Sequence, residues 1–171
     1  PVQRPEAPQR WAQEGSQPPL YYALTAALTR WVDTSDLDRV VAVNPHARVG
    51  LPGAEDNLNA ALHGAEERFP WRGTALAVHL ARLFSVLLGA GTVWCTYRLG
   101  RLLAPGRPAV ALGAMAANAF LPQFLFISAS VNNDNLVTLL CSAGVLLLAY
   151  IALGRGSRRA PLLLGVLIGL A

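Results

Sequence analysis

Apolar runs long enough to cross a membrane constrain the fold of this 171-residue chain more than any other feature. Three runs, at about 74–97, 109–127 and 136–153, approach or reach the roughly 20 residues that cross a bilayer core. A fourth begins near residue 160, and we expect it to be truncated at residue 171. The sequence therefore predicts an all-α polytopic membrane protein.

The arginines indicate how these helices are oriented. All 14 basic residues are arginine, and six of the seven in the apolar half gather in two short turns, "RLGRLLAPGRP" and "GRGSRRAP". The intervening loop, "SASVNNDN", contains no basic residue. Because short cytoplasmic loops carry the excess of positive charge, we expect both turns inside and "SASVNNDN" outside. Arginines scattered between apolar runs also exclude the continuous basic face that nucleic-acid binding needs.

This orientation predicts that residues 1–73 form a large extracytoplasmic loop and that residues 74–171 form the transmembrane bundle. The loop contains one apolar stretch, "PPLYYALTAALTRWV", which is too short to span. A crossing there would also turn the arginine clusters outward. We expect an interfacial helix near 19–32 instead, with Tyr21, Tyr22 and Trp31 at the level of the headgroups.

Two polar residues interrupt the start of the first long run. His79 and Arg82 are three residues apart, so they share one face of a helix near its predicted outer end. One interpretation is that Arg82 extends to the phosphates of the outer leaflet while His79 packs at the interface. The other is that the pair holds an anionic group of a substrate. The residues alone leave both interpretations open.

Further polar groups are predicted on the same side of the membrane. Asp134 is the only acid after residue 75, and with Asn133 it lies in the outer loop. Asp134 either caps the helix that follows or pairs with Arg82, His79, a sugar or a metal. Residues 1–73 add groups that bind hydroxyls, although several are equally typical of turns. These groups are Glu14, Gln17, Asn44, His46, Asp56, Asn57, Asn59 and His63.

Two features concern helix packing. Ala109, Gly113 and Ala117 recur at four-residue spacing, which allows close approach of helices and predicts ordinary packing in a bundle. Pro122 should kink the second spanning helix near its outer end.

Several blocks together resemble a family: "EGSQPPLYYALTAAL", "NPHARVGLPGAEDNLN", "FPWRGTALAVHLARLFSVLLGAGTVW" and "PQFLFISASVNNDNLV". The chain is similar to the GT-C membrane glycosyltransferases, specifically the bacterial branch related to protein O-mannosyltransferases and lipid A aminoarabinose transferases. The resemblance implies a GT-C-like helical bundle in the inner (plasma) membrane, with juxtamembrane helices in its first outer loop. Such enzymes move a sugar from a polyprenyl-phosphate donor to a protein, glycan or lipid acceptor at the outer surface.

The resemblance also implies which parts this chain contributes. The Asp-Glu pair that acts as the catalytic acid and base is expected upstream of Pro1, so the chain would be an inactive fragment of an active enzyme. We expect it to bind substrate; the candidate residues are Arg82, His79, Asp134, Asn133, Glu14, Gln17 and Tyr22. A role for a divalent metal stays open. The alternatives are a transporter or flippase, which would place polar residues such as Asn118 at mid-membrane depth, and a non-catalytic lipid-binding module.

Overall fold

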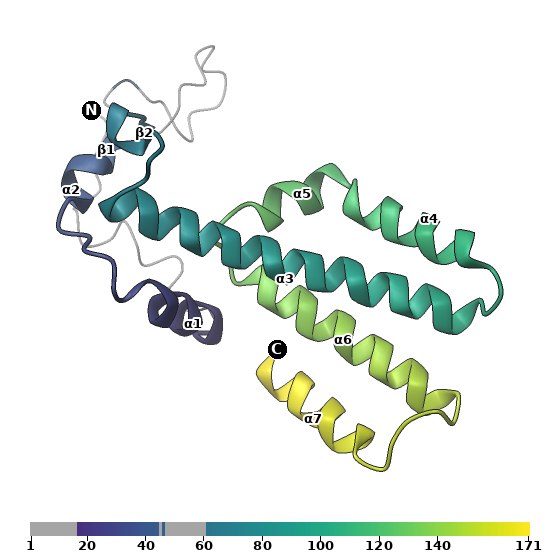
Figure 1. Ribbon diagram of the computed structural model, residues 1–171. Coiled ribbons are helices and arrows are strands. Elements are labelled where there is room, and N and C mark those ends of the chain that lie inside the picture. The colour runs from purple at the N-terminus through teal and green to yellow at the C-terminus, as the bar shows by residue number, and fades with distance from the viewer. Residues whose placement is uncertain (1–16, 45, 47–60) are drawn as a thin grey trace. The chain divides into compact units, whose positions relative to one another are not determined.

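The computed structural model describes residues 17–44, 46 and 61–171, and these residues are predominantly helical (Figure 1). The elements before the first long helix are short: α1 (Leu20–Thr29), α2 (Leu37–Val40), β1 (Ala42–Val43), β2 (Ala61–Leu62) and η3 (Ala65–Glu67). The remaining helices follow: α3 (Gly73–Leu103), α4 (Pro108–Ala119), α5 (Pro122–Ser128), α6 (Asp134–Ala152) and α7 (Ala160–Leu170). The residues form two compact units, one of residues 25–84 and one of residues 17–24 with 85–171.

Two helices, α3 and α6, are long and apolar enough to cross a membrane. The 31 residues of α3 rise about 46 Å, so this helix extends beyond a hydrocarbon core of about 30 Å. It ends at Leu103 rather than near residue 97, because no proline precedes Pro105 in this stretch. The predicted all-α membrane fold is confirmed. The one strand pairing among the described residues, β1 with β2, involves two residues on each side.

The run predicted at 109–127 is divided into two helices. They are α4 and α5. Together these helices are long and apolar enough for one membrane span, but they are bent by 65° at the break between them. Leu121 is extended, with ψ at 118°, because the ring of Pro122 disfavours a helical conformation at the residue before it. The predicted effect of Pro122 is therefore confirmed, and it is a break rather than a gentle kink.

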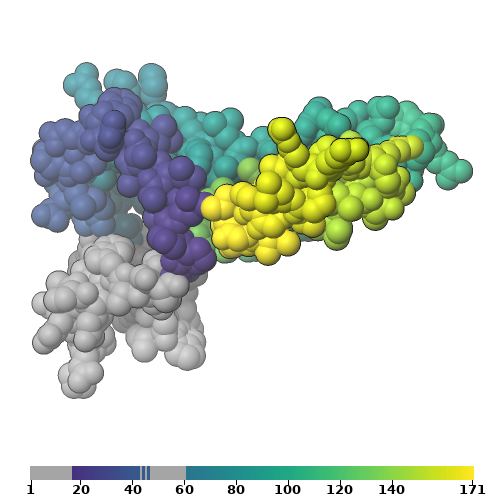
Figure 2. All heavy atoms as spheres, turned by 90° about the horizontal axis from the view of Figure 1, so that it is seen from below, coloured from purple at the N-terminus to yellow at the C-terminus, as the bar shows by residue number. Residues whose placement is uncertain are grey.

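Within the second unit, α3 provides a seam of buried side chains along its length. Ser85, Leu88, Thr92 and Cys95 follow one another at spacings of three and four residues, and all are buried. The helix α7 returns along α6 after a short turn, and the two lie side by side (Figures 1 and 2). This unit is thus a small bundle organised on α3.

Two helices approach closely at Gly100 of α3. A Cβ atom placed on Gly100 would lie 2.7 Å from the Cα atom of Ala111, which is fully buried on α4. Asn118 strengthens the same pairing, because its Nδ2 donates to Thr96 Oγ1 at 2.9 Å. The predicted packing stripe on α4 is wrong: Gly113 is exposed, and no atom lies within 4 Å of the position of a Cβ there.

This geometry separates two glycine-to-alanine substitutions. In Gly100→Ala the new methyl group meets backbone, so α3 and α4 must move apart, at a cost of about 1–3 kcal/mol. In Gly113→Ala the new methyl group displaces no atom, and alanine lowers the conformational entropy of the unfolded chain. The stability therefore stays equal or rises by up to about 1 kcal/mol. Thermal unfolding in detergent, followed by circular dichroism, measures both. Equal melting temperatures for the two variants would contradict the packing described here.

Candidate functional site

The start of α3 is held by a carboxylate that lies far away in the sequence. Asp36 Oδ1 accepts hydrogen bonds from the backbone N–H of Thr74 at 2.9 Å and from Thr74 Oγ1 at 2.6 Å. Gly73 has a φ of 52°, a conformation that side-chain-bearing residues rarely adopt, and a Cβ there would overlap the Asp36 carboxylate. The side-chain and backbone hydrogen bonds from Thr74 lower the pKa of Asp36 below its ordinary value. Asp36 is therefore the cap that fixes where α3 begins.

His79 is fixed one and a half turns further along. Its ring stacks on Trp71, with 3.7 Å between the ring centroids and 17° between the planes. Its Nδ1 lies 2.8 Å from the backbone oxygen of Ala75. Because a carbonyl oxygen only accepts, Nδ1 carries the proton, and Nε2 is left to bind another group. The residues that the structure describes provide no partner for Nε2.

Arg82 lies one turn beyond His79 on the same helix. Its side chain is exposed, and no hydrogen bond or ion pair to it is found within the described part of the chain. No charged side chain follows until Arg98, about 24 Å further along the axis at 1.5 Å per residue. The structure therefore presents a histidine nitrogen and a guanidinium, both unpartnered by described residues, near one end of the apolar part of α3.

The loop between α5 and α6 is tied together by Asn135. This side chain is buried, and its Nδ2 lies within 3.2 Å of the backbone oxygens of Ile127, Ser130 and Asn132. Asn132 Oδ1 in turn accepts from the backbone N–H of Asp134 at 2.9 Å. These bonds fix the loop at the start of α6 with asparagines that the sequence analysis had not singled out for this purpose.

Asp134 and Asn133 have different surroundings from those expected. Asp134 is the first residue of α6, and its carboxylate is exposed. Of the roles that the sequence left open for Asp134, the structure does not contain the cap, because Asn132 Oδ1 accepts the bond from the helix start. Asn133 occupies the capping position without making a capping bond. It is 5% exposed, and its Oδ1 has no hydrogen-bond partner among the described residues. A buried oxygen without a donor is costly, which makes Asn133 a candidate for binding a group outside this chain.

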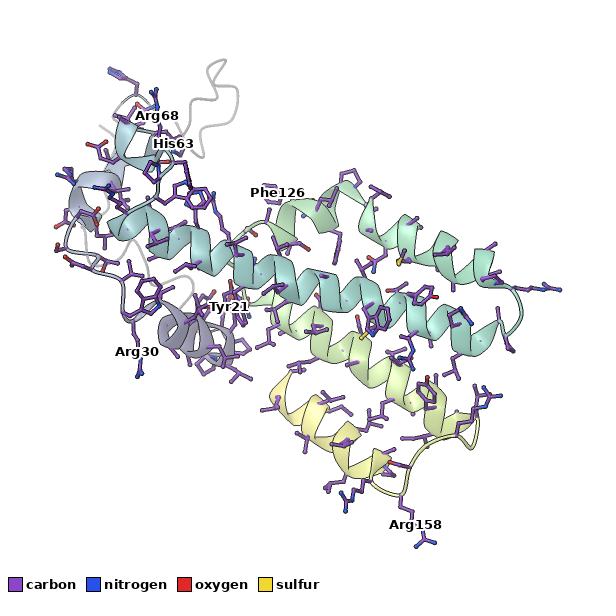
Figure 3. All side chains as sticks on the ribbon, viewed as in Figure 1. Tyr21, Arg30, His63, Arg68, Phe126 and Arg158 are labelled. Carbon is purple, nitrogen blue, oxygen red and sulfur yellow. The ribbon has the colours of Figure 1, made fainter. Side chains whose placement is uncertain are left out.

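The tyrosines of "PPLYY" lie in two environments. Tyr21 is only 1% exposed, and its hydroxyl lies 2.7 Å from Ser85 Oγ on α3 (Figure 3). The ring of Tyr21 therefore packs in the protein, and its position at the level of the headgroups stays a prediction. Tyr22 donates to Gln17 Oε1 at 3.4 Å, so two of the candidate residues are neighbours. Glu14 lies outside the described residues.

Of the remaining candidates among the first 73 residues, those that the structure describes form local contacts. Asn44 Oδ1 accepts from the backbone N–H of His46 at 3.0 Å, as in a turn. His63 pairs with Glu67 at 2.8 Å on the surface. Asp56, Asn57 and Asn59 lie outside the described residues. Within the parts that are described, no three His, Cys, Asp or Glu side chains gather as metal ligands would.

The structure thus brings the site candidates into groups. His79 and Arg82 share one end of α3 in the unit of residues 25–84, whereas Asn133, Asp134, Gln17 and Tyr22 belong to the other unit. Helices of spanning length, connected by short turns and bearing polar groups near their ends, define an integral membrane protein.

The family follows from comparison with known proteins. The chain belongs to the dolichyl-phosphate-mannose-protein mannosyltransferase family, whose model matches residues 76–171, more than half of the chain. Neither the curated proteins nor the solved structures contain a match. The resemblance to protein O-mannosyltransferases is confirmed, and the matched region includes His79, Arg82, Asn133 and Asp134.

The cap on α3 predicts a pH-dependent contribution to stability. The pKa of Asp36 is lower in the folded state than in the unfolded chain, so its contribution is fully present above about pH 4 and is lost as the pH falls through the lowered value. Asp36→Ala should therefore lower the melting temperature at pH 7, and the difference from the unsubstituted protein should shrink as the pH falls toward 3.

Asp38→Ala is the matched control, because Asp38 is exposed and its removal changes the net charge equally. We expect this variant to melt within a degree or so of the unsubstituted protein at every pH. If both variants lost the same amount of melting temperature at pH 7, the loss would be due to the change in charge rather than to the bonds to Thr74.

Proposed function

We propose that this chain contributes the donor-binding part of a glycosyltransferase that moves a sugar from a polyprenyl-phosphate donor to an acceptor at the outer membrane surface. The family supports a mannosyltransferase-type enzyme. The observation that carries the proposal is the exposed guanidinium of Arg82, which has no partner among the described residues and lies near one end of a spanning helix.

A lipid-linked donor places its phosphate at the membrane boundary, since its chain lies in the bilayer. When the sugar leaves, negative charge builds on that phosphate, and a preorganised cation lowers the barrier by stabilising it. Arg82 suits this task because a guanidinium binds phosphate through two parallel hydrogen bonds. His79 supports it, since the stack on Trp71 and the bond to Ala75 orient Nε2 without using it.

The sugar and the acceptor need hydroxyl-binding groups on the same side of the membrane. Asn133 and Asp134 are proposed for this role because each has a side-chain oxygen that no described residue bonds. Gln17 and Tyr22, which are bonded to one another, and Glu14 are proposed as further contacts in the same loop system. The arginine-poor loop before α6 supports an outer position for these groups, and with it an extracytoplasmic position for residues 1–73 and a place in the inner (plasma) membrane.

One observation weighs against a transporter. That alternative relied on polar residues at mid-membrane depth, above all Asn118. Asn118 donates to Thr96 and thereby joins α4 to α3, so its amide already has a structural role.

The proposal predicts a specific loss in Arg82→Ala. Removing one group that stabilises charge in the transition state typically lowers kcat by about 10²–10³-fold, and the KM for the donor should rise because the ground-state phosphate loses the same contact. The variant is made in the gene at its natural length, and transfer is measured in membranes with a polyprenyl-phosphate mannose donor. Arg82→Lys should restore part of the activity, because it returns the charge without the paired hydrogen bonds.

Arg30→Ala provides the matched control. Arg30 is also exposed and projects away from α1 into solvent (Figure 3), so its loss changes net charge without removing the proposed contact. We expect transfer within about twofold of the unsubstituted enzyme. Normal donor KM and turnover in Arg82→Ala, in protein inserted at the usual level, would refute the role proposed for Arg82.

A further inference from the structure

A second set of arginines lies at the other end of α3 and is not used by the proposed reaction. A surface hollow of about 330 Å³ opens there between the ends of α3 and α6. Its lining consists of Tyr97, Arg98, Arg101, Leu102, Tyr150 and Arg155. We call it the arginine–tyrosine pocket. All six residues belong to the unit that contains residues 85–171.

Hydrogen bonds to tyrosine hydroxyls orient two of the guanidinium groups. Arg98 Nη2 donates to the hydroxyl of Tyr150 on α6 at 3.0 Å, and Arg101 Nη1 donates to the hydroxyl of Tyr97 at 3.2 Å. Each guanidinium has five N–H groups, so most of its donors stay available. Both arginines are exposed, whereas Leu102, which also lines the pocket, is buried.

The third arginine is brought to the pocket by the end of α6. The backbone N–H of Arg155 donates to the oxygen of Tyr150 at 2.9 Å, and that of Gly154 donates to the oxygen of Ile151 at 3.0 Å. Gly154 has a φ of 67°, so these bonds form a Schellman motif. The motif ties the backbone of Arg155 to the residue whose hydroxyl binds Arg98. The pocket is thus built by fold geometry and is more than a run of basic sequence.

Among the described residues, no carboxylate pairs with these arginines. The only acid among residues 85–171 is Asp134, at the opposite end of α6 and about 31 Å from Arg155 along the chain axis at 1.5 Å per residue. Three guanidinium groups that converge without a counter-charge repel one another, and an anion placed among them removes that repulsion. The planar fork of a guanidinium matches the geometry of phosphate and forms paired hydrogen bonds with it.

The surroundings indicate that this phosphate belongs to a lipid. Trp94 and Leu103 on α3 and Leu153 beyond α6 flank the pocket residues in sequence, and they are 56%, 63% and 49% exposed. Trp94 packs on Tyr97, with 5.6 Å between the ring centroids, and the Arg98 guanidinium lies 5.8 Å from the Trp94 ring. Tryptophan and tyrosine concentrate at the membrane–water boundary, where a headgroup meets its acyl chains. Basic pockets between spanning helices bind anionic headgroups in this setting.

We infer that the arginine–tyrosine pocket binds the phosphate of an anionic phospholipid in the leaflet at the arginine-rich end of α3 and α6. The inference rests on the spanning helices and not on the proposed sugar transfer. It assigns this end of the bundle a lipid that is distinct from the donor, because the two sites lie at opposite ends of the charge-free stretch of α3.

Native mass spectrometry of the protein in detergent tests this inference with phosphatidylglycerol as the probe. Phosphatidylcholine and inorganic phosphate are titrated separately. The pocket variant Arg98→Gln/Arg101→Gln should bind phosphatidylglycerol about tenfold more weakly, because two charge-assisted contacts are lost. The matched variant Arg107→Gln/Arg158→Gln removes two exposed arginines outside the pocket, and its affinity should change by less than about twofold.

Tyr150→Phe covers the case in which the double variant fails to fold. It removes only the hydroxyl that orients Arg98 and should weaken phosphatidylglycerol binding about threefold. Equal losses in the pocket and matched variants, equal binding of phosphatidylcholine, or binding of inorganic phosphate as tight as that of phosphatidylglycerol would each overturn the inference. Sugar transfer is not measured in this experiment, so its outcome is independent of the proposed function.

Discussion

The charge-free stretch of α3 between Arg82 and Arg98 is the constraint on which the other features depend. Its length of about 24 Å is close to the thickness of a hydrocarbon core, and we propose that a guanidinium lies near each boundary. The buried seam that begins at Ser85 lies within this stretch, and the neighbouring helices pack against it. The position of α3 in a bilayer therefore determines the positions of the helices that pack against its buried seam.

The two ends of α3 differ in chemistry. At one end, Asp36 caps the helix, and the Trp71 ring and the backbone oxygen of Ala75 orient His79. Arg82 follows His79 by one turn on the same helix. At the other end, arginines are held by tyrosine hydroxyls and by a helix terminus. We interpret the first end as suited to a reacting phosphate and the second as suited to a stationary lipid. The donor phosphate and the stationary lipid are both anionic, so the side of the membrane on which each occurs determines which end of α3 binds it.

Sequence reasoning predicted what depends on local pattern. The apolar runs, the break at Pro122 and the helical face shared by His79 and Arg82 all follow from residue spacing, and the structure contains them. The family, too, was recognisable from short blocks.

The contacts that hold the candidate site did not follow from spacing. Asp36 and Thr74 are 38 residues apart, and Tyr21 and Ser85 are 64 apart, so no periodicity relates them. Capping of α6 was one of the roles left open for Asp134 because aspartate is a common cap, whereas the structure has Asn132 forming the bond. The small-residue stripe around Gly113 was a plausible packing face, but only the position of Gly100 against α4 shows which glycine is needed.

The central claim is that the loop before α6 lies outside and the turn after α6 lies inside, and cysteine labelling in intact cells tests it most directly. Cys95 and Cys141 are first replaced by serine, and a single cysteine is then introduced at Val131 or at Ser157, both of which are exposed. The account predicts that a membrane-impermeant maleimide labels Val131→Cys in intact cells and labels Ser157→Cys only after lysis. Labelling of Ser157→Cys in intact cells, with Val131→Cys protected until lysis, would contradict it.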